Sequence, residues 1–216
     1  MSPILEQIQE QLQQYPEAKL GFVVYRCTYG DDAAWKRCLN FLTVQALESL
    51  KDTELESMSS RLDWNVQENK RVLDGASFDV VREDFRHWIE DGHEINIASP
   101  RHHACIVIDK PSLQSILRWQ PTSRSRRNFD ADGSTWVNLL SKRDEDPHPV
   151  EEDEEEDDDD SDAGNGLLKN DDREPQDKVS CCRVGTSYLV PRIWELMEGP
   201  GWKSFAHHPG GRVVTE

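Results

Sequence analysis

The sequence predicts an α+β domain with a single mixed sheet of four or five strands, covered mainly on one side by helices, and a long disordered acidic insert. Strand-like runs and amphipathic helical stretches follow one another in mixed order along the chain. Seven Trp residues and several aliphatic clusters provide the apolar surface of one core. An unbroken acidic run over 151–160 interrupts this pattern and indicates the insert.

Charge separates the insert from the domain. The chain has 216 residues and a formal net charge of −17, and residues 144–162 contain 14 acidic side chains and no Lys or Arg. The rest of the chain therefore has a net charge of only −3. Charge this dense cannot be buried and repels itself into an extended, solvated segment. We expect one domain over 1–142 and 178–206, a disordered acidic insert over 143–177 and a flexible tail over 207–216.

Two helices and a strand are predicted in the first fifty residues. Apolar residues at helical spacing predict a helix over 3–14, which Pro16 ends. Residues 19–28 are rich in β-branched and aromatic types and predict a strand that is buried on both faces. Asp31 and Asp32 supply an N-cap and favourable charge for the next helix. Its inward residues are Trp35, Leu39, Leu42, Ala46 and Leu50.

The middle of the chain predicts a short helix, an extended segment and a longer helix. Thr53 and Glu56 have capping-box spacing, and 62–67 alternates between apolar and polar residues. A helix over 78–91 is capped by Ser77 and stopped by Gly92. Its inner face comprises Val81, Phe85, Trp88 and Ile89. Its outer face comprises Arg82, Glu83, Arg86 and Glu90.

The second half of the chain predicts three strands and two helices. Residues 103–109 form the strongest strand pattern, and Pro111 suits the first turn of the helix that follows. Further strands are expected over 134–140 and 178–184, and the last helix over 187–198.

The cysteine pattern and the apolar runs bear on the compartment. An odd count of five Cys without regular spacing predicts reduced thiols, and the N-terminal segment lacks the basic start and apolar run of a secretory signal. No stretch reaches the roughly 20 apolar residues that span a bilayer. We therefore expect a cytoplasmic or nuclear protein that is not secreted, without a membrane partner.

Four segments carry a resemblance. GFVVYRCTYGDDAAW, LDGASFDVVREDFRHWI, CIVIDKPSLQSIL and VGTSYLVPRIWELMEGPGWKSF resemble a group of uncharacterised filamentous-fungal intracellular proteins. In such proteins a Tyr-Arg strand precedes a Trp-bearing helix, a Phe-x-x-Trp segment leads into a strand ending Ile-Asp, and a helix with a nearby Trp closes the fold. The resemblance implies an intracellular fungal protein and brings no known reaction with it.

The best concentration of chemistry-capable side chains surrounds one strand. His103, Cys105 and Asp109 would point to one face and His102 to the other, so a Cys nucleophile beside a His oriented by an Asp is conceivable. Triad partners usually come from separate segments, and no nucleophile elbow surrounds Cys105. The favoured interpretation is structural: Cys105 packs in the core and Asp109 caps the next helix.

Metal and cofactor sites find little support. Zinc bound by His103 and Cys105, with Cys181–Cys182 or His207–His208, would lack the usual ligand spacing. Neither glycine-rich nucleotide motif occurs in the sequence. We expect neither a metal nor a cofactor.

Two basic features complete the candidates. Arg26 lies in an apolar strand, where it needs a carboxylate partner or a route to water; a carboxylate or anion site is the functional alternative. The basic segment 118–127 suggests contact with nucleic acid or a nuclear-localisation patch, but the acidic insert would compete for it, so no nucleic acid is expected.

Two functions of different classes remain. The sequence favours a non-enzymatic intracellular protein-interaction module of unknown pathway, with an unknown protein partner. The alternative is an enzyme of unrecognised type, an accessory in a fungal biosynthetic pathway, with a pocket near His103 and Asp109. A chaperone for basic proteins rests on the acidic run alone. A concave apolar pocket with convergent polar groups would favour the enzyme, and an exposed apolar patch would favour the module.

Overall fold

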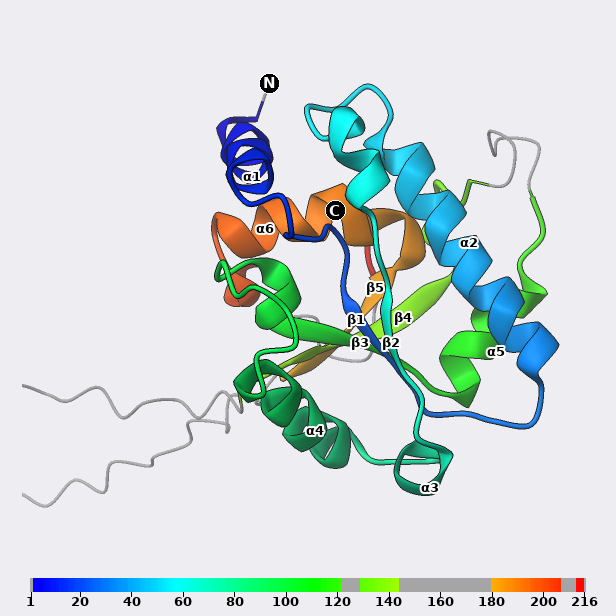
Figure 1. Ribbon diagram of the computed structural model, residues 1–216. Helices are drawn as coiled ribbons and strands as arrows, with labels where there is room; N and C mark the ends of the chain where they lie inside the picture. The colour runs from blue at the N-terminus through cyan, green and yellow to red at the C-terminus, as the bar shows by residue number, and fades with distance from the viewer. Residues whose placement is uncertain (1, 122–128, 144–179, 207–212, 216) are drawn as a thin grey trace, which may run out of the picture.

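The computed structural model describes residues 2–121, 129–143, 180–206 and 213–215. Its strands form one mixed sheet in the order β2-β1-β3-β4-β5-β6 (Figure 1). The strands are β1 (Val23–Arg26), β2 (Asn65–Gln67), β3 (Ala104–Ile108), β4 (Trp136–Ser141), β5 (Cys181–Gly185) and β6 (Val213–Val214). The predicted α+β class with a single mixed sheet is therefore confirmed, whereas the strand number of four or five is wrong because the described chain forms six.

The sheet changes direction in its middle. β1 pairs in parallel with both β2 and β3, β4 pairs antiparallel with β3 and β5, and β6 is parallel to β5. The sixth strand lies within the stretch 207–216 that the sequence assigns to a flexible tail, and Val214 is buried against the core. A two-residue strand is too short to produce a recognisable alternation, which explains why the pattern did not reveal it.

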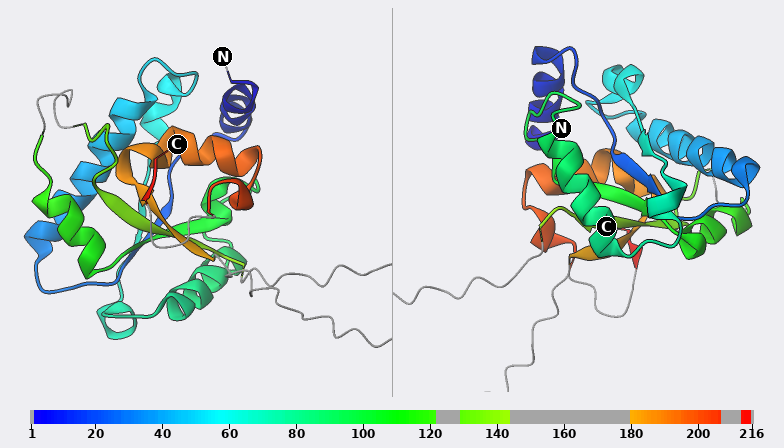
Figure 2. Two further views of the ribbon diagram at one scale, coloured as in Figure 1. Left: turned by 180° about the vertical axis from the view of Figure 1, so that it is seen from behind. Right: turned by 60° about the horizontal axis from the view of Figure 1, so that its bottom comes forward.

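Helices cover both faces of the sheet unequally (Figure 2). The helices are α1 (Pro3–Gln14), α2 (Asp32–Leu50), α3 (Lys70–Leu73), α4 (Phe78–Glu90), α5 (Lys110–Arg118) and α6 (Trp194–Glu198). Buried side chains of α1, α2, α5 and α6 belong to the larger core cluster on one face. Leu73 of α3 and the inner face of α4 belong to a second cluster on the other face. In the described part of the chain, the helices therefore cover mainly one side of the sheet.

The first strand is shorter than the predicted 19–28. Gly21 has φ +113°, and a Cβ at this position would collide with the carbonyl oxygen of Asp63. Leu20 makes an isolated bridge with Leu62, and the regular strand begins at Val23. The extended segment predicted over 62–67 is reduced to β2.

Helix α4 follows its prediction except at one side chain. Ser77 caps it, accepting from the amide of Val80, and Gly92 adopts φ +66° after its end. Arg82, predicted on the outer face, is only 3% exposed. Its Nε donates to the carbonyl of Ser141 at 3.1 Å, and its two terminal nitrogens reach Asp79 and Ser180. The long stem lets the guanidinium fold back over the sheet, which helical spacing cannot foretell.

The closing helix is also shorter than expected. In place of a helix over 187–198, the chain forms a 3₁₀ turn (Thr186–Tyr188), an irregular turn (Leu189–Ile193) and then α6. Val190 has φ −137° and ψ 126°, an extended conformation that residues before proline prefer. The short helix predicted after Thr53 is a 3₁₀ helix over Glu56–Arg61. The predicted insert, 143–177, lies almost wholly outside the described residues.

Candidate functional site

Strand β3 separates the residues of the candidate triad instead of uniting them. His103 precedes the strand and Asp109 follows it, so six steps of about 3.3 Å place them roughly 20 Å apart at opposite ends of β3. Cys105 lies between them and is completely buried on the α4 face, beside Val23 and Tyr25. Burial raises the pKa of the Cys105 thiol well above its ordinary value. The thiolate that a nucleophile requires is therefore disfavoured here.

Asp109 has the structural role that the sequence favours. Its carboxylate accepts from the amide of Ser112 at 2.9 Å, and the Ser112 hydroxyl contacts the Asp109 amide at 3.0 Å. This reciprocal pair is a capping box that starts α5. The Asp109 carboxylate, which the triad hypothesis assigned to orienting a histidine, instead accepts a hydrogen bond from the first turn of α5.

Arg26 is a buried ion-pair centre at the end of β1. Its side chain is 5% exposed and reaches Asp32 at 2.6 Å and Glu68 at 3.5 Å. The guanidinium also lies over the rings of Tyr29 and Trp35, with distances of 4.5 and 5.2 Å to the ring centroids. Two carboxylates compensate the buried charge, as burial of an arginine demands. The arrangement supports the structural ion pair over an open anion site.

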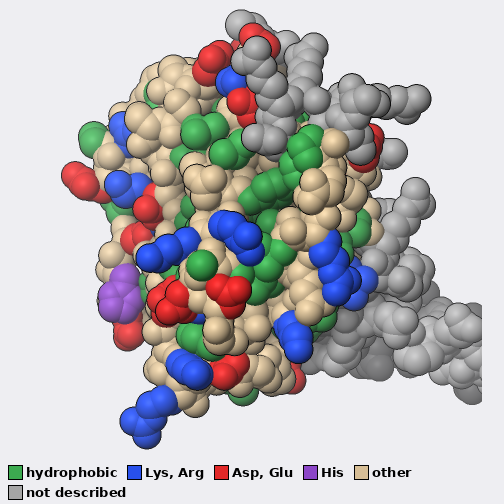
Figure 3. Space-filling view, turned by 90° about the vertical axis from the view of Figure 1, so that its right-hand side faces the viewer, with side chains coloured by type: hydrophobic (Ala, Val, Ile, Leu, Met, Phe, Trp, Pro, Cys, Tyr) green, Lys and Arg blue, Asp and Glu red, His purple; other side chains and the backbone are tan. Residues whose placement is uncertain are grey.

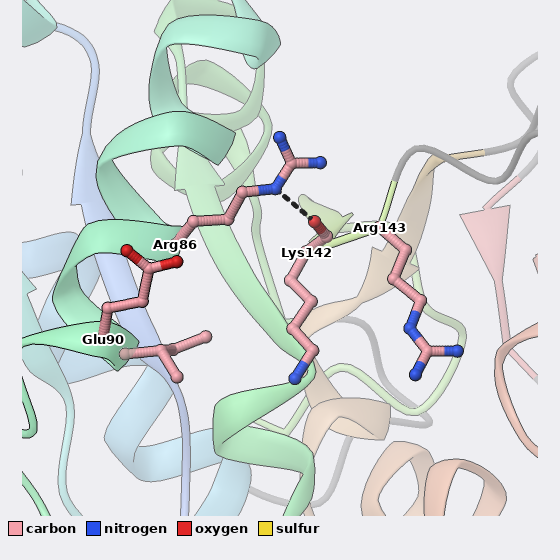
Figure 4. A pocket seen from close by; sticks show the side chains of 5 residues that line it. Arg86, Glu90, Lys142 and Arg143 are labelled. Atoms are coloured by element: carbon pink, nitrogen blue, oxygen red, sulfur yellow. Dashed lines mark hydrogen bonds between the residues drawn. The ribbon is translucent and has the colours of Figure 1, made fainter.

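A basic hollow lies next to His103, at the end of β3 that is opposite to Asp109. Its lining comprises His103, Ser141, Lys142, Arg143, Met197, Pro200, Gly201, Trp202 and Lys203, and its volume is about 310 Å³. A second hollow of about 540 Å³ is lined by Lys142, Arg143 and three residues of α4, Arg86, Ile89 and Glu90 (Figure 4). The segment after β4 therefore contributes cations to both hollows.

Main-chain hydrogen bonds hold this segment in place. The amide of Lys142 donates to the carbonyl of His103 at 3.0 Å, which continues the antiparallel pairing of β3 and β4 by one residue. The carbonyl of Lys142 accepts from Nε of Arg86 at 2.8 Å, the bond drawn in Figure 4. The position of Lys142 is thus set by its backbone, and its side chain is left to define the hollow.

The hollow has a positive potential. Burial lowers the pKa of Lys142, and the adjacent Arg143 lowers it further. Burial likewise lowers the pKa of His103, and Lys142 and Arg143 act in the same direction. Because a carbonyl oxygen can only accept, Nε2 of His103 donates to the carbonyl of Ala98 at 2.9 Å. His103 is therefore a neutral ring in a cationic surrounding.

An apolar surface lies elsewhere on the molecule. Figure 3 shows hydrophobic side chains in a band on the face that carries α2 and α5. The partly exposed side chains of these elements include Leu47, which is 37% exposed, and Phe41, whose ring meets that of Trp119 edge to face at 5.3 Å. No described segment shows what would cover this band.

Within the described residues, no group of three or more His, Cys, Asp or Glu side chains could hold a metal ion. None of the helices in the described ranges has the length and apolarity to cross a membrane. His207 and His208 fall outside the described residues, as does most of the basic segment 118–127. No protein-family model, curated protein or solved structure matches the chain.

The sequence named one residue of the basic hollow, His103, and missed the cations beside it. Lys142 is the last residue of the predicted domain segment 1–142, and Arg143 is the first residue of the predicted insert 143–177. The sequence did contain a useful signal: two adjacent cations directly after a buried strand lie at the end of that strand, where side chains can reach the surface. Their proximity to His103 and Trp202, however, depends on strand register and on a contact with the distant C-terminal segment.

Proposed function

We propose that the protein is a non-enzymatic intracellular protein-interaction module whose folded domain docks an acidic segment of a partner protein in the basic hollow. The observation that carries the proposal is an imbalance of charge. Within the described ranges, the three buried arginines, Arg26, Arg82 and Arg101, each have a carboxylate partner within 2.7 Å. Lys142 and Arg143 have no carboxylate partner among the residues that the structure describes.

Unbalanced cations beside a hollow are suited to an acidic ligand. A partner carboxylate would regain Coulomb energy that the half-buried Lys142 lacks in the isolated domain, and steering would speed the encounter. The acidic insert carries a charge opposite to that of the basic hollow. A partner with both basic and acidic segments would therefore meet a complementary charge at each. The intracellular setting is supported by the free thiols of all five Cys residues.

The enzyme alternative gains less from the geometry. It requires a pocket near His103 and Asp109, and the basic hollow lies beside His103 only. The hydroxyl that lines this hollow, Ser141 Oγ, accepts from the amide of Arg143 at 3.2 Å, and no hydrogen bond to His103 activates it. A neutral histidine surrounded by cations supports ligand binding better than nucleophilic catalysis.

The test compares charge reversal at two separate sites, each of which is a pair of neighbouring cations. Full-length protein, Lys142→Glu/Arg143→Glu and the matched control Lys36→Glu/Arg37→Glu, whose exposed pair lies on α2, are used to isolate cross-linked partners from cytosolic extract. We expect the same partners with the parent and the control, and their loss with the first variant. They should also be lost when salt rises from about 0.1 M to about 1 M, because the Debye length falls from ~10 to ~3 Å. Partners that the Lys142/Arg143 variant retains would contradict the proposal.

A further inference from the structure

The basic hollow combines cationic and apolar side chains in its lining. Lys142 and Arg143, at the end of β4, form a cationic wall. Met197 of α6, Pro200 of the turn that follows and Trp202 of the 3₁₀ helix Trp202–Ser204 form an apolar wall. The same 3₁₀ helix also contributes Lys203 to the lining. The indole of Trp202 meets the ring of the buried Phe205 edge to face at 5.4 Å, which fixes its orientation. A ligand that fills the hollow therefore needs an anionic end and an apolar body.

The number of uncompensated charges restricts the anion. Two adjacent cations, Lys142 and Arg143, lack a carboxylate partner among the described residues. One carboxylate would balance one of them and leave the other. A phosphate monoester has about −1.5 to −2 charges at neutral pH and three strong acceptor oxygens, so it matches both. Arginine and lysine side chains also donate to phosphate oxygens in strong, charge-assisted hydrogen bonds.

Resting on the proposed function, we propose that the basic hollow binds the phosphate group of a phosphorylated side chain on the partner protein. The phosphate lies against Lys142 and Arg143, and the apolar wall packs against the atoms that bear it. His103, which its hydrogen bond to Ala98 holds in place, also lines the hollow. A phosphotyrosyl ring uses the apolar wall fully, whereas a phosphoseryl methylene uses little of it.

The experiment measures binding of four fluorescent peptides to the full-length protein at about 0.15 M salt. The peptides share one acidic frame and differ at a single position, which is phosphotyrosine, phosphoserine, Glu or Tyr. We expect both phosphopeptides to bind at least about tenfold more tightly than the Glu peptide, because the second charge and third acceptor contribute only there. The phosphotyrosyl peptide should bind most tightly of all.

Three variants locate the binding. Lys142→Met/Arg143→Met keeps the main-chain bonds of this segment and should reduce phosphopeptide affinity at least about tenfold, while Lys36→Met/Arg37→Met should leave it unchanged. Trp202→Leu should bring the phosphotyrosyl peptide to the level of the phosphoseryl peptide. Thermal unfolding confirms that each variant is folded.

The possible outcomes separate the inference from the proposed function. If the Glu peptide binds at the hollow within about threefold of both phosphopeptides, the phosphate assignment is overturned while the interaction module stands. If no peptide binds, both are overturned. Phosphopeptide binding that survives Lys142→Met/Arg143→Met places the phosphate elsewhere and also overturns the inference.

Discussion

The imidazole of His102 stacks on the indole of Trp88, with ring centroids 5.8 Å apart and ring planes inclined by 27°. His102 is 3% exposed and Trp88 is 6% exposed. Nδ1 of His102 lies 3.3 Å from Ser99 Oγ, whereas Nε2 has no hydrogen-bond partner within the described part of the chain. An imidazolium at this place would be a buried and poorly solvated charge, so the folded protein holds the ring neutral.

Stability should therefore fall in mild acid. Burial lowers the pKa of His102 from 6.5 to about 4, with Arg101, His103 and Lys142 contributing and Glu94 opposing. Between these values the unfolded chain binds the proton and the folded chain does not, so the free energy of unfolding falls as pH decreases from 6.5 to 4. The linked loss approaches ~3 kcal/mol at the acid end. Urea unfolding at pH 7 and at pH 4.5 measures it.

A variant isolates the histidine from the carboxylates that also titrate. His102→Phe keeps a ring on Trp88 and removes the proton site, so its loss of stability between the two pH values should be smaller than that of the parent. His87→Gln, at an exposed position on α4, should behave like the parent. Equal pH dependence in His102→Phe and the parent would show that His102 does not titrate in this range.

Removal of the indole should be costly. Trp88 also stacks on Phe85, with centroids 6.1 Å apart and an angle of 16° between the rings. Trp88→Ala should lower the free energy of unfolding by about 3–5 kcal/mol, because it leaves a cavity between α4 and the sheet. Val80→Ala on the same helix, where the side chain is 43% exposed, should change it by less than ~0.5 kcal/mol. Equal effects in chemical denaturation would contradict the assignment of the buried face.

Asp130 organises the entry to β4. The carboxylate is 2% exposed and accepts from the amides and hydroxyls of Ser134 and Thr135, at distances between 2.6 and 3.2 Å. Asp130→Ala leaves the buried amide of Thr135 without an acceptor, whereas the Thr135 hydroxyl keeps Thr186 Oγ1 at 2.6 Å, so we expect a loss of about 1–3 kcal/mol. Asp130→Asn keeps one acceptor and should lose less. The exposed Asp132→Ala should be close to neutral in the same calorimetric measurement.

Local patterns predicted the fold where local physics decides it. Helix α4 could be located because Ser77 is a side-chain cap, Gly92 permits a positive φ, and Val81, Phe85 and Trp88 repeat at helical spacing. The same pattern failed at Arg82, whose place depends on the carbonyl of Ser141 in a strand far along the chain. Long polar side chains with several rotatable bonds follow tertiary partners and not periodicity.

The candidate site was harder to predict for the same reason. The grouping of His103, Cys105 and Asp109 rested on sequence proximity, yet strand geometry spreads these residues from one end of β3 to the other. The basic hollow instead joins His103 to Lys142 through antiparallel register and to Trp202 through the closing segment. Neither register nor the packing of the last helix can be derived from one sequence without knowing which strands are neighbours.

The acidic stretch occupies the position of a hairpin loop. Leu140 of β4 faces Cys181 of β5, and the amide of Ser141 donates to the carbonyl of Ser180 at 2.9 Å. The chain therefore leaves β4 after Ser141 and returns beside it at Ser180. A turn of about four residues can join two such antiparallel strands. Residues 144–179 are thus not needed to bridge a distance.

Replacement of 144–179 by Gly-Asn-Gly-Ser should accordingly preserve the fold. Because closure entropy grows with the logarithm of loop length, the shorter connection should raise the free energy of unfolding by up to ~2 kcal/mol. Urea unfolding measures the change, and a chain with residues 144–179 in scrambled order serves as the control for composition. If the segment instead makes stabilising contacts with the domain, the midpoint of thermal unfolding should drop by more than about 10 °C, since 1 kcal/mol moves a domain of this size by only ~2–4 °C. Such a drop, shared by the scrambled chain, would assign the contacts to specific residues of 144–179, because scrambling keeps the charge and changes only the order. A drop in the shortened chain alone would assign the contacts to the charge and composition of the segment.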